Sequence, residues 1–421
     1  MTEPSRLTEP APLIELAEDA TEVQAFEAAD AWLRANLPGD VLKAALDADW
    51  DAVGAFLDDP QRGPAWYAAL GDAGLSTPTW PRECGGLGLS ARAAGAVADA
   101  VLRYRVDRGM IDFVGLALAG PTIIFHGTPR QRERYLRPLA RGEHRWCQLF
   151  SEPGAGSDLA GLSTRAERQD DGTWVVNGQK VWSSFAHIAD YGLLMARTDP
   201  ALPKHRGIGY FLLDMRTPGV DARPLKQMTG DAEFNEVFLT DVRLPADALL
   251  GEVNGGWTVA ITTLMQERNG LTGLPAVGEG RADVLLRRAR DNGTLAEPVL
   301  RDDLLRFLVE ERVLQMTTVR AHAESGRKAA GAEGSIRKLV NARLEEKAGA
   351  LAAEVEPLAA LAWEQGRQNS AASYEFLVMK QASIAGGTPE IQRNIIAERV
   401  LGLPKDPDPD KNVPFNERQR G

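Results

Sequence analysis

The chain has 421 residues, of which 44% are hydrophobic and 25% charged, and its formal net charge is −11. This length allows several domains and a core that needs no disulfide bonds, and Cys84 and Cys147 are too few and too far apart for a disulfide framework or a zinc site. The negative charge argues against a nucleic-acid partner. No stretch reaches the roughly 18 apolar residues of a membrane span, and the first residues lack a signal-peptide pattern. We therefore expect a cytoplasmic globular protein without a membrane span.

The N-terminal third of the sequence is predicted to be helical. Residues 1–20 carry prolines and acidic residues with little periodicity, so we expect a flexible arm there. Ser90 precedes an alanine-rich helical pattern, and Thr128 followed by Pro129 marks another helix start, because threonine caps a helix and proline suits its first position. We predict an N-terminal helical domain over residues 21–145.

The pattern changes over residues 146–250, where runs of β-branched and aromatic residues alternate with Gly, Pro and Asp. The segment TWVVNGQKVWSS places Asn177 and Gly178 between two β-forming runs, which predicts a hairpin turn. At the start of the region, RWCQLF at residues 145–150 can form a short strand. We predict a middle β-barrel domain over this region.

Helical periodicity returns over residues 251–404, which we predict to be a C-terminal helical bundle. Residues 405–421 are rich in proline and charge and are predicted to wrap a surface as a tail. Helices, then strands, then helices indicate an α+β chain with a sheet between two helical regions.

The first helix of this last region raises a question about two charges. In WTVAITTLMQERNGLTGL, apolar residues recur every three or four positions, and Glu267 falls on the stripe formed by Leu264 and Leu271. Arg268 falls on the neighbouring stripe. Burying a charge without a partner is costly, so these side chains either reach solvent or face a ligand.

The segment SEPGAGSDLAG is a candidate ligand-binding loop. Gly154 and Gly156 can adopt positive φ and let a ligand approach the backbone, and the hydroxyls of Ser151 and Ser157 can donate hydrogen bonds. The spacing matches neither a P-loop nor a GxGxxG motif. The segment is therefore either an ordinary glycine-rich turn or a ligand loop.

Two further segments allow a structural and a functional interpretation. Trp182 ends a predicted strand beside Ser183 and Ser184, and it is either a core residue or a surface for a flat ring. In GGTPEIQRNII, Thr388 and Pro389 predict a helix start, which also suits an anionic group.

The remaining polar residues allow one further ligand site and argue against metal and hydrolase chemistry. Lys204, His205 and Arg206 form a basic triplet that is either a solvated loop or a phosphate clamp. The five histidines show no metal-ligand spacing, and no HExxH, GxSxG or CxxC motif occurs. We therefore expect no metal site and no serine or metal hydrolase.

Taken in order, these segments resemble the acyl-CoA dehydrogenase family. The resemblance extends from about Gly71 to about Pro404 and rests on TWPRECGGLGLS, GTPRQRERYLRPLARGE, SEPGAGSDLAG, NGQKVWSS, NEVFLTDVRLP and TPEIQRNIIAERVLGLP. It implies the fold of that family, with an N-terminal helical domain, a β domain and a C-terminal four-helix bundle. It also implies an oxidoreductase of lipid metabolism and β-oxidation, similar to actinobacterial enzymes of sterol and fatty-acid breakdown.

The resemblance implies a flavoenzyme that holds FAD without a covalent bond. The residues that match FAD-contacting positions of the family are Gln148, Phe150, Ser151, Ser157, Trp182, Ser183, Ser184, Thr388 and Glu390. The residues that match substrate-contacting positions are Ser157, Arg268 and Gly387. We therefore expect an acyl-CoA substrate, and electron-transfer flavoprotein or a similar protein as the electron acceptor.

Glu267 matches the catalytic base of the isovaleryl-type enzymes, which place it on the helix after the β domain. Many family members carry the base two residues before the matched threonine, but that position is Gly386 here. The implied reaction converts an acyl-CoA to the trans-2-enoyl-CoA, with Glu267 taking the α-proton and FAD accepting the β-hydride. An apolar position should raise the pKa of Glu267 because desolvation disfavours its charge, and this strengthens the base.

Two segments depart from the family pattern. RRARDNGTL at residues 287–295 replaces an Arg-x-x-Phe-Gly segment, and LAALAWEQGR at residues 358–367 replaces a Gly-Gly-rich loop. In homotetramers of the family these elements hold the adenosine half of FAD across a subunit interface. We therefore expect a homo- or hetero-oligomer, either a dimer or a tetramer. The alternatives to an active dehydrogenase are a non-catalytic or half-site subunit of a heteromeric enzyme and a flavin oxidase or monooxygenase on the same fold.

Overall fold

The computed structural model describes most of the chain, in the segments 13–107, 109–271, 280–325, 333–363 and 370–418. The chain forms two compact units. The first unit contains the residues up to Pro224, the segment Glu233–Gln266 and the residues from Asp410 onward. The second unit contains Leu225–Ala232 and Glu267–Pro409.

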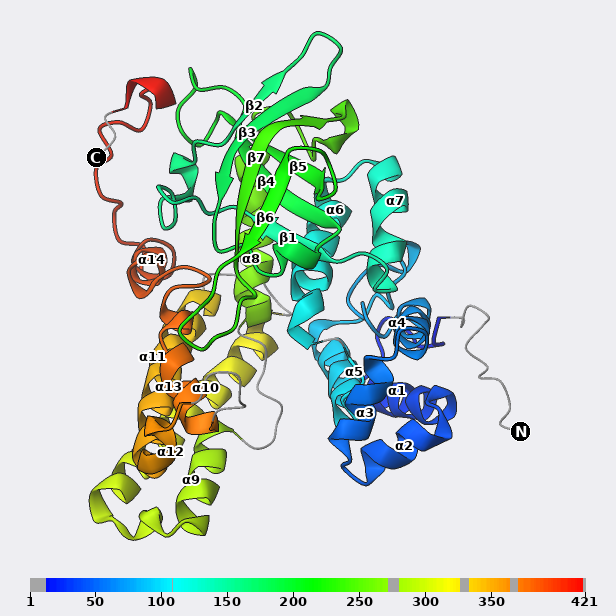
Figure 1. Cartoon of the computed structure of the whole chain (residues 1–421), viewed down its shortest axis with the longest axis vertical. Helices are drawn as coiled ribbons and strands as arrows, with labels where there is room; N and C mark the ends of the chain where they lie inside the picture. The colour runs from blue at the N-terminus through cyan, green and yellow to red at the C-terminus, as the bar shows by residue number, and fades with distance from the viewer. Residues whose placement is uncertain (1–12, 108, 272–279, 326–332, 364–369, 419–421) are drawn as a thin grey trace. The chain divides into compact units, whose positions relative to one another are not determined.

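Helices form the N-terminal part of the first unit (Figure 1). They are α1 (Glu22–Asn36), α2 (Gly39–Leu46), α3 (Trp50–Leu57), α4 (Arg62–Asp72), α5 (Ala91–Tyr104), α6 (Gly120–His126) and α7 (Pro129–Ala140). Two predicted helix starts are confirmed, because Ser90 caps α5, and Thr128 caps α7 with Pro129 in its first turn. Helix α1 packs along α5, and their facing alanine and leucine side chains form part of the core of this region.

The expectation of a flexible arm over residues 1–20 is wrong for the part that the structure describes. Ile14 donates its backbone N–H to the carbonyl of Ala73 at 3.2 Å, and Leu13 and Leu16 pack against the N-terminal helical core. These contacts join residues far apart in the sequence, so the local pattern does not report them. Residues 1–12 lie outside the described residues.

Seven strands of the first unit form one sheet within the described residues. They are β1 (Trp146–Leu149), β2 (Arg165–Arg168), β3 (Trp174–Lys180), β4 (Tyr191–Arg197), β5 (Ile208–Asp214), β6 (Val220–Pro224) and β7 (Asn235–Leu244). Their order is β1-β4-β2-β3-β7-β6, with β5 paired to β4. Strand β4 is parallel to β1 and β2, and the other pairs are antiparallel. Runs of β-branched and aromatic residues in the sequence, among them YGLLMART and IGYFLLDM, indicated β1, β3, β4, β5 and β7, but not the short strands β2 and β6.

The predicted turn at Asn177 and Gly178 is wrong, because both residues lie inside β3. The pairing of β3 with β7 shifts between Val176 and Gly178, which marks a β-bulge. Across the bulge, Asn177 donates its amide to the Asp241 carboxylate at 3.0 Å and accepts a hydrogen bond from the Asp241 backbone N–H at 2.9 Å. The hairpin instead joins β2 to β3 through residues 169–173.

Both faces of strand β4 are buried, since successive side chains of a strand point to opposite faces. Leu193 and Met195 belong to a core that includes residues of α6 and of α8 (Gly256–Leu271). Leu194 and Ala196 belong to a second core with residues of β7. This two-sided packing fixes the strands whose ends carry the candidate site.

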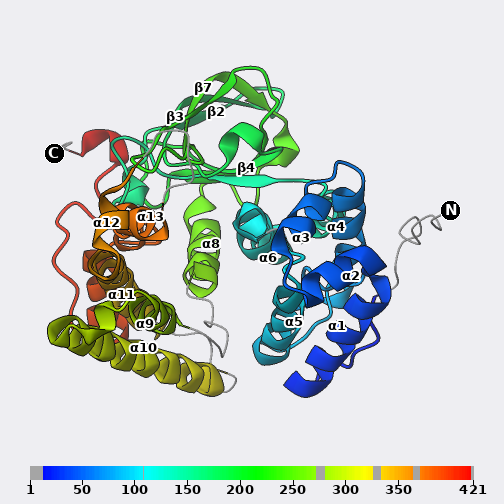
Figure 2. The ribbon, with the colours of Figure 1, turned by 60° about the horizontal axis from the view of Figure 1, so that its bottom comes forward.

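Helices form most of the second unit, and Figure 2 shows them from another side. The unit includes the last residues of α8, from Glu267 onward. Its other helices are α9 (Arg281–Asp291), α10 (Pro298–Ser325), α11 (Glu333–Val355), α12 (Pro357–Leu361), α13 (Ala371–Val378) and α14 (Pro389–Ile395). Helix α11 packs against α10, α13 and α14, and Leu285, Phe307 and Leu351 contribute to the buried apolar core. In the part of the chain that the structure describes, no helix is long and apolar enough to cross a membrane.

Candidate functional site

The loop of residues 151–161 follows β1, and Glu152 closes it. Glu152 and Ala155 exchange backbone hydrogen bonds of 3.0 Å. The Glu152 carboxylate also accepts hydrogen bonds from the backbone N–H groups of Ser163 at 2.6 Å and Thr164 at 2.9 Å. One acidic side chain therefore fixes both ends of the loop, which distinguishes it from an ordinary glycine-rich turn.

A buried ion pair joins this loop to the end of β3. Lys180 is fully buried, and its Nζ donates to Glu152 Oε1 at 2.8 Å and to the carbonyl of Phe150 at 3.0 Å. Burial acts to raise the pKa of Glu152, but the Lys180 charge and the hydrogen bonds to the carboxylate hold that pKa below its usual range. The pair therefore holds the ends of β1 and β3 together.

The glycines of the loop do not have the predicted conformation. Neither Gly154 nor Gly156 has positive φ, and an added Cβ at either position would meet no atom within 4 Å. Ser157 is exposed and Ser151 is half-buried beside them. The exposure of Ser157 therefore does not depend on a backbone conformation that only glycine adopts.

The two predicted cofactor residues on β1 and just after it differ in their surroundings. The side chain of Phe150 lies in the core, with its ring edge-on to Tyr210 at 5.7 Å between centroids. Its contribution near the loop is the carbonyl that accepts from Lys180. Gln148 is half-buried on β1.

Trp182 is not a core residue, so that interpretation of the sequence is wrong. Its side chain is 62% exposed, and its backbone has a φ of 60°, in the left-handed region that non-glycine residues rarely adopt. The ring lies edge-on to Phe234 at 6.0 Å. Next to it, Ser183 is buried, and in the described part of the chain its Oγ has no hydrogen-bond partner. Ser184 is half-buried.

Asn235, the first residue of β7, fixes this strained segment. Its side-chain amide donates to the backbone carbonyls of Ser183 and Glu233, both at 2.9 Å. Its backbone carbonyl accepts a hydrogen bond from the Ser183 backbone N–H at 3.0 Å. Its side-chain oxygen lies 3.0 Å from His187 Nδ1. Asn235 is not among the predicted site residues, and the signal that marks it is an amide at the start of a strand, where it can hold a neighbouring loop.

These features of the first unit fit the flavin that the resemblance implies. An exposed aromatic ring, a buried hydroxyl with an unused hydrogen-bonding group, and a loop of further hydroxyls together suit a flat ligand with a polar edge. The backbone strain at Trp182 indicates that the surrounding contacts hold it there.

In the second unit, Glu267 is half-buried near the C-terminal end of α8. Lys338 on α11 is 5% exposed, and it lies close enough for its charge to interact with that of Glu267. Burial lowers the pKa of Lys338, and the Glu267 charge opposes this. The Lys338 Nζ also donates to the carbonyl of Ala382. The side chain of Arg268 lies outside the described residues.

The segment before α14 needs glycine for its backbone. Gly386 and Gly387 have φ of 65° and 90°, and Gln392 on α14 donates its amide to their carbonyls at 2.9 and 3.3 Å. An added Cβ at Gly387 would lie 2.6 Å from that amide nitrogen. Gln392 is a positioning residue that the sequence analysis missed.

The predicted helix start at Thr388 is confirmed, because Thr388 caps α14 by accepting a hydrogen bond from the Ile391 backbone N–H at 3.4 Å. Glu390 in the first turn is exposed and pairs with Arg393 at 3.2 Å. Its pKa is held low by backbone and side-chain hydrogen bonds and by the Arg393 charge.

The basic triplet after β4 is tied to the loop of residues 151–161. Lys204 donates to the Asp158 carboxylate at 2.7 Å, and its side chain is 18% exposed, so it is not simply solvated. The ring of His205 lies edge-on to Trp257 at 4.8 Å. Lys204 therefore supports the loop directly.

Two observations limit other kinds of site. A cleft of about 650 Å³ in the first unit is lined mainly by residues of α4, of α7 and its C-cap, and of the segment before α5, including Arg82, Arg132 and Arg141. None of the predicted site residues lines it. Among the described residues, no cluster of His, Cys, Asp and Glu could hold a metal ion.

Comparison with known proteins assigns every domain of the chain. Residues 27–143, 147–242 and 254–401 match the N-terminal, middle and C-terminal domains of acyl-CoA dehydrogenases. The solved structure described as "Tcur3481-Tcur3483 steroid ACAD" is similar with a TM-score of 0.74 and 27% sequence identity, over 93% of this chain and 100% of that chain.

Two relatives are described as acyl-CoA dehydrogenases. IpdE1 of Mycolicibacterium smegmatis is 38% identical over 404 residues, which cover 91% of this chain and 99% of IpdE1. FadE34 of Mycobacterium tuberculosis is 42% identical over 342 residues, which cover 80% of this chain but 46% of FadE34, so the chain spans about half the length of that relative. The chain therefore belongs to the acyl-CoA dehydrogenase family, whose members are FAD-dependent oxidoreductases that act on the CH–CH bond of acyl-CoA thioesters.

Proposed function

We propose that the chain dehydrogenates an acyl-CoA thioester to the trans-2-enoyl-CoA, with FAD as cofactor and Glu267 as catalytic base. The observation that supports this most is the pair Trp182 and Ser183, where an exposed ring in strained backbone adjoins a buried hydroxyl without a partner in the described chain. Strain of this kind persists only where surrounding contacts enforce it, and it concentrates at functional sites. A scaffold without a ligand gives no reason for it.

The residues of the first unit have binding roles in this proposal. Bound FAD supplies an oxidised isoalloxazine ring, which accepts the hydride equivalent from the β-carbon of the substrate. Trp182 offers an apolar surface for a flat ring, and Ser183 and Ser184 offer hydroxyls to its polar edge. Ser151 and Ser157 offer further donors from a loop that Glu152 holds in place.

The carboxylate of Glu267 removes the α-proton of the substrate. Gly386 has no side chain to do so, and Glu390 is exposed and paired with Arg393. Lys338 is close enough to interact with Glu267, and a neighbouring positive charge favours the ionised form that can accept a proton. Burial and Lys338 therefore act on the base in opposite directions, and the raised pKa expected from the sequence stays a prediction.

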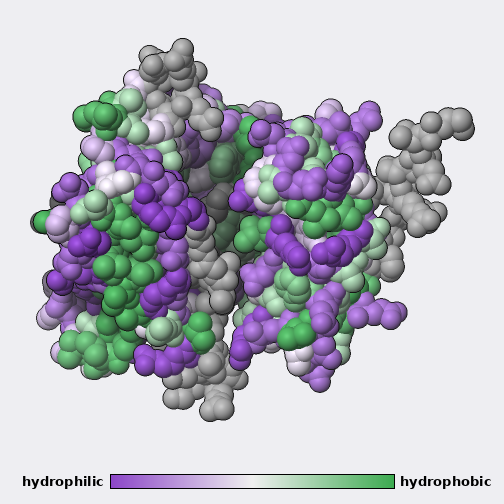
Figure 3. Space-filling model, turned by 90° about the horizontal axis from the view of Figure 1, so that it is seen from below, coloured by the Kyte–Doolittle hydropathy of each residue, from purple (hydrophilic) through white to green (hydrophobic). Residues whose placement is uncertain are grey.

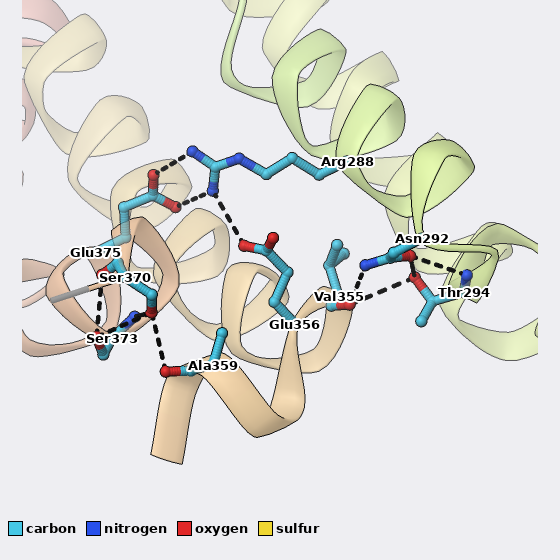
Figure 4. Close-up of polar contacts among 9 residues, drawn as sticks. All are labelled: Arg288, Asn292, Thr294, Val355, Glu356, Ala359, Ser370, Ser373 and Glu375. Atoms are coloured by element: carbon cyan, nitrogen blue, oxygen red, sulfur yellow. Dashed lines mark hydrogen bonds and ion pairs between the residues drawn. The ribbon is translucent and has the colours of Figure 1, made fainter. Parts of the chain in front are cut away.

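The departures from the family pattern favour a heteromeric enzyme as a second proposal. Arg288 makes two hydrogen bonds to Glu375, at 3.0 and 3.2 Å, and Asn292 donates to the carbonyl of Val355 at 2.9 Å (Figure 4). Arg288 and Asn292 of the segment 287–295 thus contact other residues of the second unit. This supports a partner chain that supplies the missing cofactor contacts, as the paired name of the similar steroid ACAD structure also suggests.

The same comparisons support a first choice of substrate class and partners to test. That structure is described as a steroid ACAD, so we propose a bulky, steroid-type acyl group as the first substrate class to test. We also propose that the enzyme works in the cytoplasm and passes electrons to electron-transfer flavoprotein.

Replacing Glu267 by Gln tests the catalytic assignment. We expect the variant to retain bound FAD, with its visible absorption spectrum, and to lose about 10³-fold or more in turnover, because general bases contribute roughly 10²–10⁴-fold. The assay uses straight, branched and steroid-bearing acyl-CoAs with an artificial electron acceptor. Turnover within a few-fold of the unmodified chain would refute Glu267 as the base.

The colour of the purified chain separates the two proposals. A homo-oligomeric dehydrogenase is yellow when expressed alone. A half-site subunit is pale alone and gains flavin only when it is co-expressed with its partner. Oxygen consumption without an added acceptor would instead favour an oxidase.

A further inference from the structure

Residues 410–418 follow the second unit in the sequence but belong to the first unit, where they contact the loop between β4 and β5. We call these residues the C-terminal strap. The strap pairs with that loop through its backbone, and Pro414 forms a β-bridge with Pro203. The backbone N–H of Phe415 donates to the carbonyl of Leu202, and that of Asn416 donates to the carbonyl of Pro200, both at 3.0 Å. The tail is therefore fixed at a defined place on the first unit.

The ring of Phe415 covers the guanidinium of Arg197, the last residue of β4. The ring centroid lies 3.9 Å from Arg197 Cζ. Arg197 is 4% exposed, and burial lowers its pKa to about 10. A cation over an aromatic face is attracted by the ring, and the attraction grows when water is excluded. The strap thus both shields and binds a buried cation.

Arg197 also forms hydrogen bonds to the candidate cofactor loop. Its Nη2 donates to the carbonyls of Ala160 at 2.6 Å and Leu162 at 3.2 Å, and its Nη1 donates to the carbonyl of Lys204 at 2.6 Å. Lys204 in turn pairs with Asp158 at 2.7 Å. The loop that carries Ser157 is therefore held by Arg197, which the strap covers, and by Lys204, which follows the residues that pair with the strap.

We propose that Phe415 is a positioning residue which, through Arg197, holds the loop of Ser157 in its cofactor-binding arrangement, so that the C-terminal strap sets how tightly FAD is retained. Hydrogen bonds from a charged donor strengthen when the local dielectric is low, which is the effect of the covering ring. The proposed function enters only through the identity of the ligand, because the chain of contacts from Phe415 to the loop does not depend on it.

Hydrogen exchange of the full chain without cofactor tests the link. In Phe415→Ala, and in a chain ending at Pro409, we expect the amides of residues 157–162 to exchange about tenfold faster, in line with the loss of a buried cation–π contact. Phe415→Tyr keeps the ring and should restore the slow exchange, and a chain ending at Arg418 keeps the strap and serves as the matched control. Exchange in α1 should stay unchanged.

Titration with FAD, followed by flavin fluorescence, tests the consequence. We expect the dissociation constant to rise about tenfold in Phe415→Ala and to stay near that of the unmodified chain in Phe415→Tyr. Unchanged exchange in the loop, equally faster exchange in α1, or faster loop exchange with unchanged FAD affinity would each overturn the proposal. If the unmodified chain bound no FAD on its own, the homo-oligomeric form of the proposed function would fail, and the exchange result alone would decide the link from strap to loop.

Discussion

At the scale of single residues, the candidate site depends on side chains that act through the backbone of others. Asn235 holds Ser183 and with it the strained Trp182, and Gln392 holds the carbonyls of Gly386 and Gly387. Such amides offer donors and an acceptor together, so one side chain can fix a loop at several points. The residues expected to contact the ligand are therefore different from the residues that hold them in position.

Lys338 gives a prediction at this scale. Its positive charge favours the ionised form of Glu267, so its removal should disfavour that form. In Lys338→Met we expect the acidic limb of the pH–rate profile to move to higher pH, because the ionised carboxylate of Glu267 loses a favourable charge interaction. The profile of kcat against pH measures this.

A matched control lies on the same helix. Lys347 also belongs to α11, but it pairs with Glu310 at 3.1 Å. Lys347→Met should leave the acidic limb in place. An equal movement in both variants, or none in Lys338→Met, would argue that Lys338 supports only the fold.

At the scale of secondary-structure elements, the pair of Glu152 and Lys180 joins the ends of β1 and β3. A hydrophobic core positions strands but leaves their ends free to fray, whereas a buried pair with further hydrogen bonds fixes a geometry. Here the same carboxylate also holds Ser163 and Thr164. The two loops with candidate cofactor residues are thus tied to one another before any ligand binds.

Glu152→Gln should therefore destabilise the protein by about 3–5 kcal/mol at neutral pH, because it leaves Lys180 buried without its counter-charge. The low pKa of Glu152 also gives a pH dependence. Its stabilising contribution is complete above the unfolded value of about 4.3 and is lost as the pH falls through the lower folded value. Denaturant unfolding of both proteins at pH 7 and below pH 4 measures this, and the two stabilities should converge in acid.

An exposed pair on β2 provides the comparison. Glu167 lies 3.4 Å from Arg165, and both side chains are more than half exposed. Glu167→Gln should change the stability by less than ~1 kcal/mol. A Glu152→Met, Lys180→Met double variant that is as unstable as Glu152→Gln would contradict the explanation by an unpaired charge.

At the scale of the whole molecule, helix α10 of the second unit carries a row of exposed apolar side chains. Along α10, exposed apolar residues recur every three or four positions on the side opposite its buried face, and they are Leu305, Val309, Val313, Met316 and Val319. Figure 3 shows hydrophobic side chains gathered on the surface of this unit with polar ones beside them. Apolar surface in a continuous stripe marks a protein interface more often than chance exposure.

We expect Val309→Asp combined with Met316→Asp to dissociate the oligomer, because each carboxylate would have to be buried without a partner in the interface. Light scattering after size-exclusion chromatography measures the change in mass. Val23→Asp on α1 replaces an equally exposed valine elsewhere and should leave the mass unchanged. An oligomer that survives the double substitution would exclude this stripe from the interface.

The sequence by itself determined the features that short-range physics controls. Capping residues placed the starts of α5, α7 and α14, apolar periodicity located the long helices, and the family motifs led to FAD and to Glu267. These signals work because a cap, a turn of helix or a motif is read within a few residues. The proposed base lies on the predicted helix, although its placement against a substrate is still a prediction.

Only the tertiary structure decided the features that depend on contacts between distant segments. It placed Asn177 and Gly178 in a bulge opposite Asp241 and not in a turn, it decided between core and surface for Trp182, and it attached residues 13–20 and the C-terminal strap to the first unit. In each case the local sequence is compatible with both outcomes. The free-energy difference comes from a partner tens to hundreds of residues away, which a local pattern does not contain.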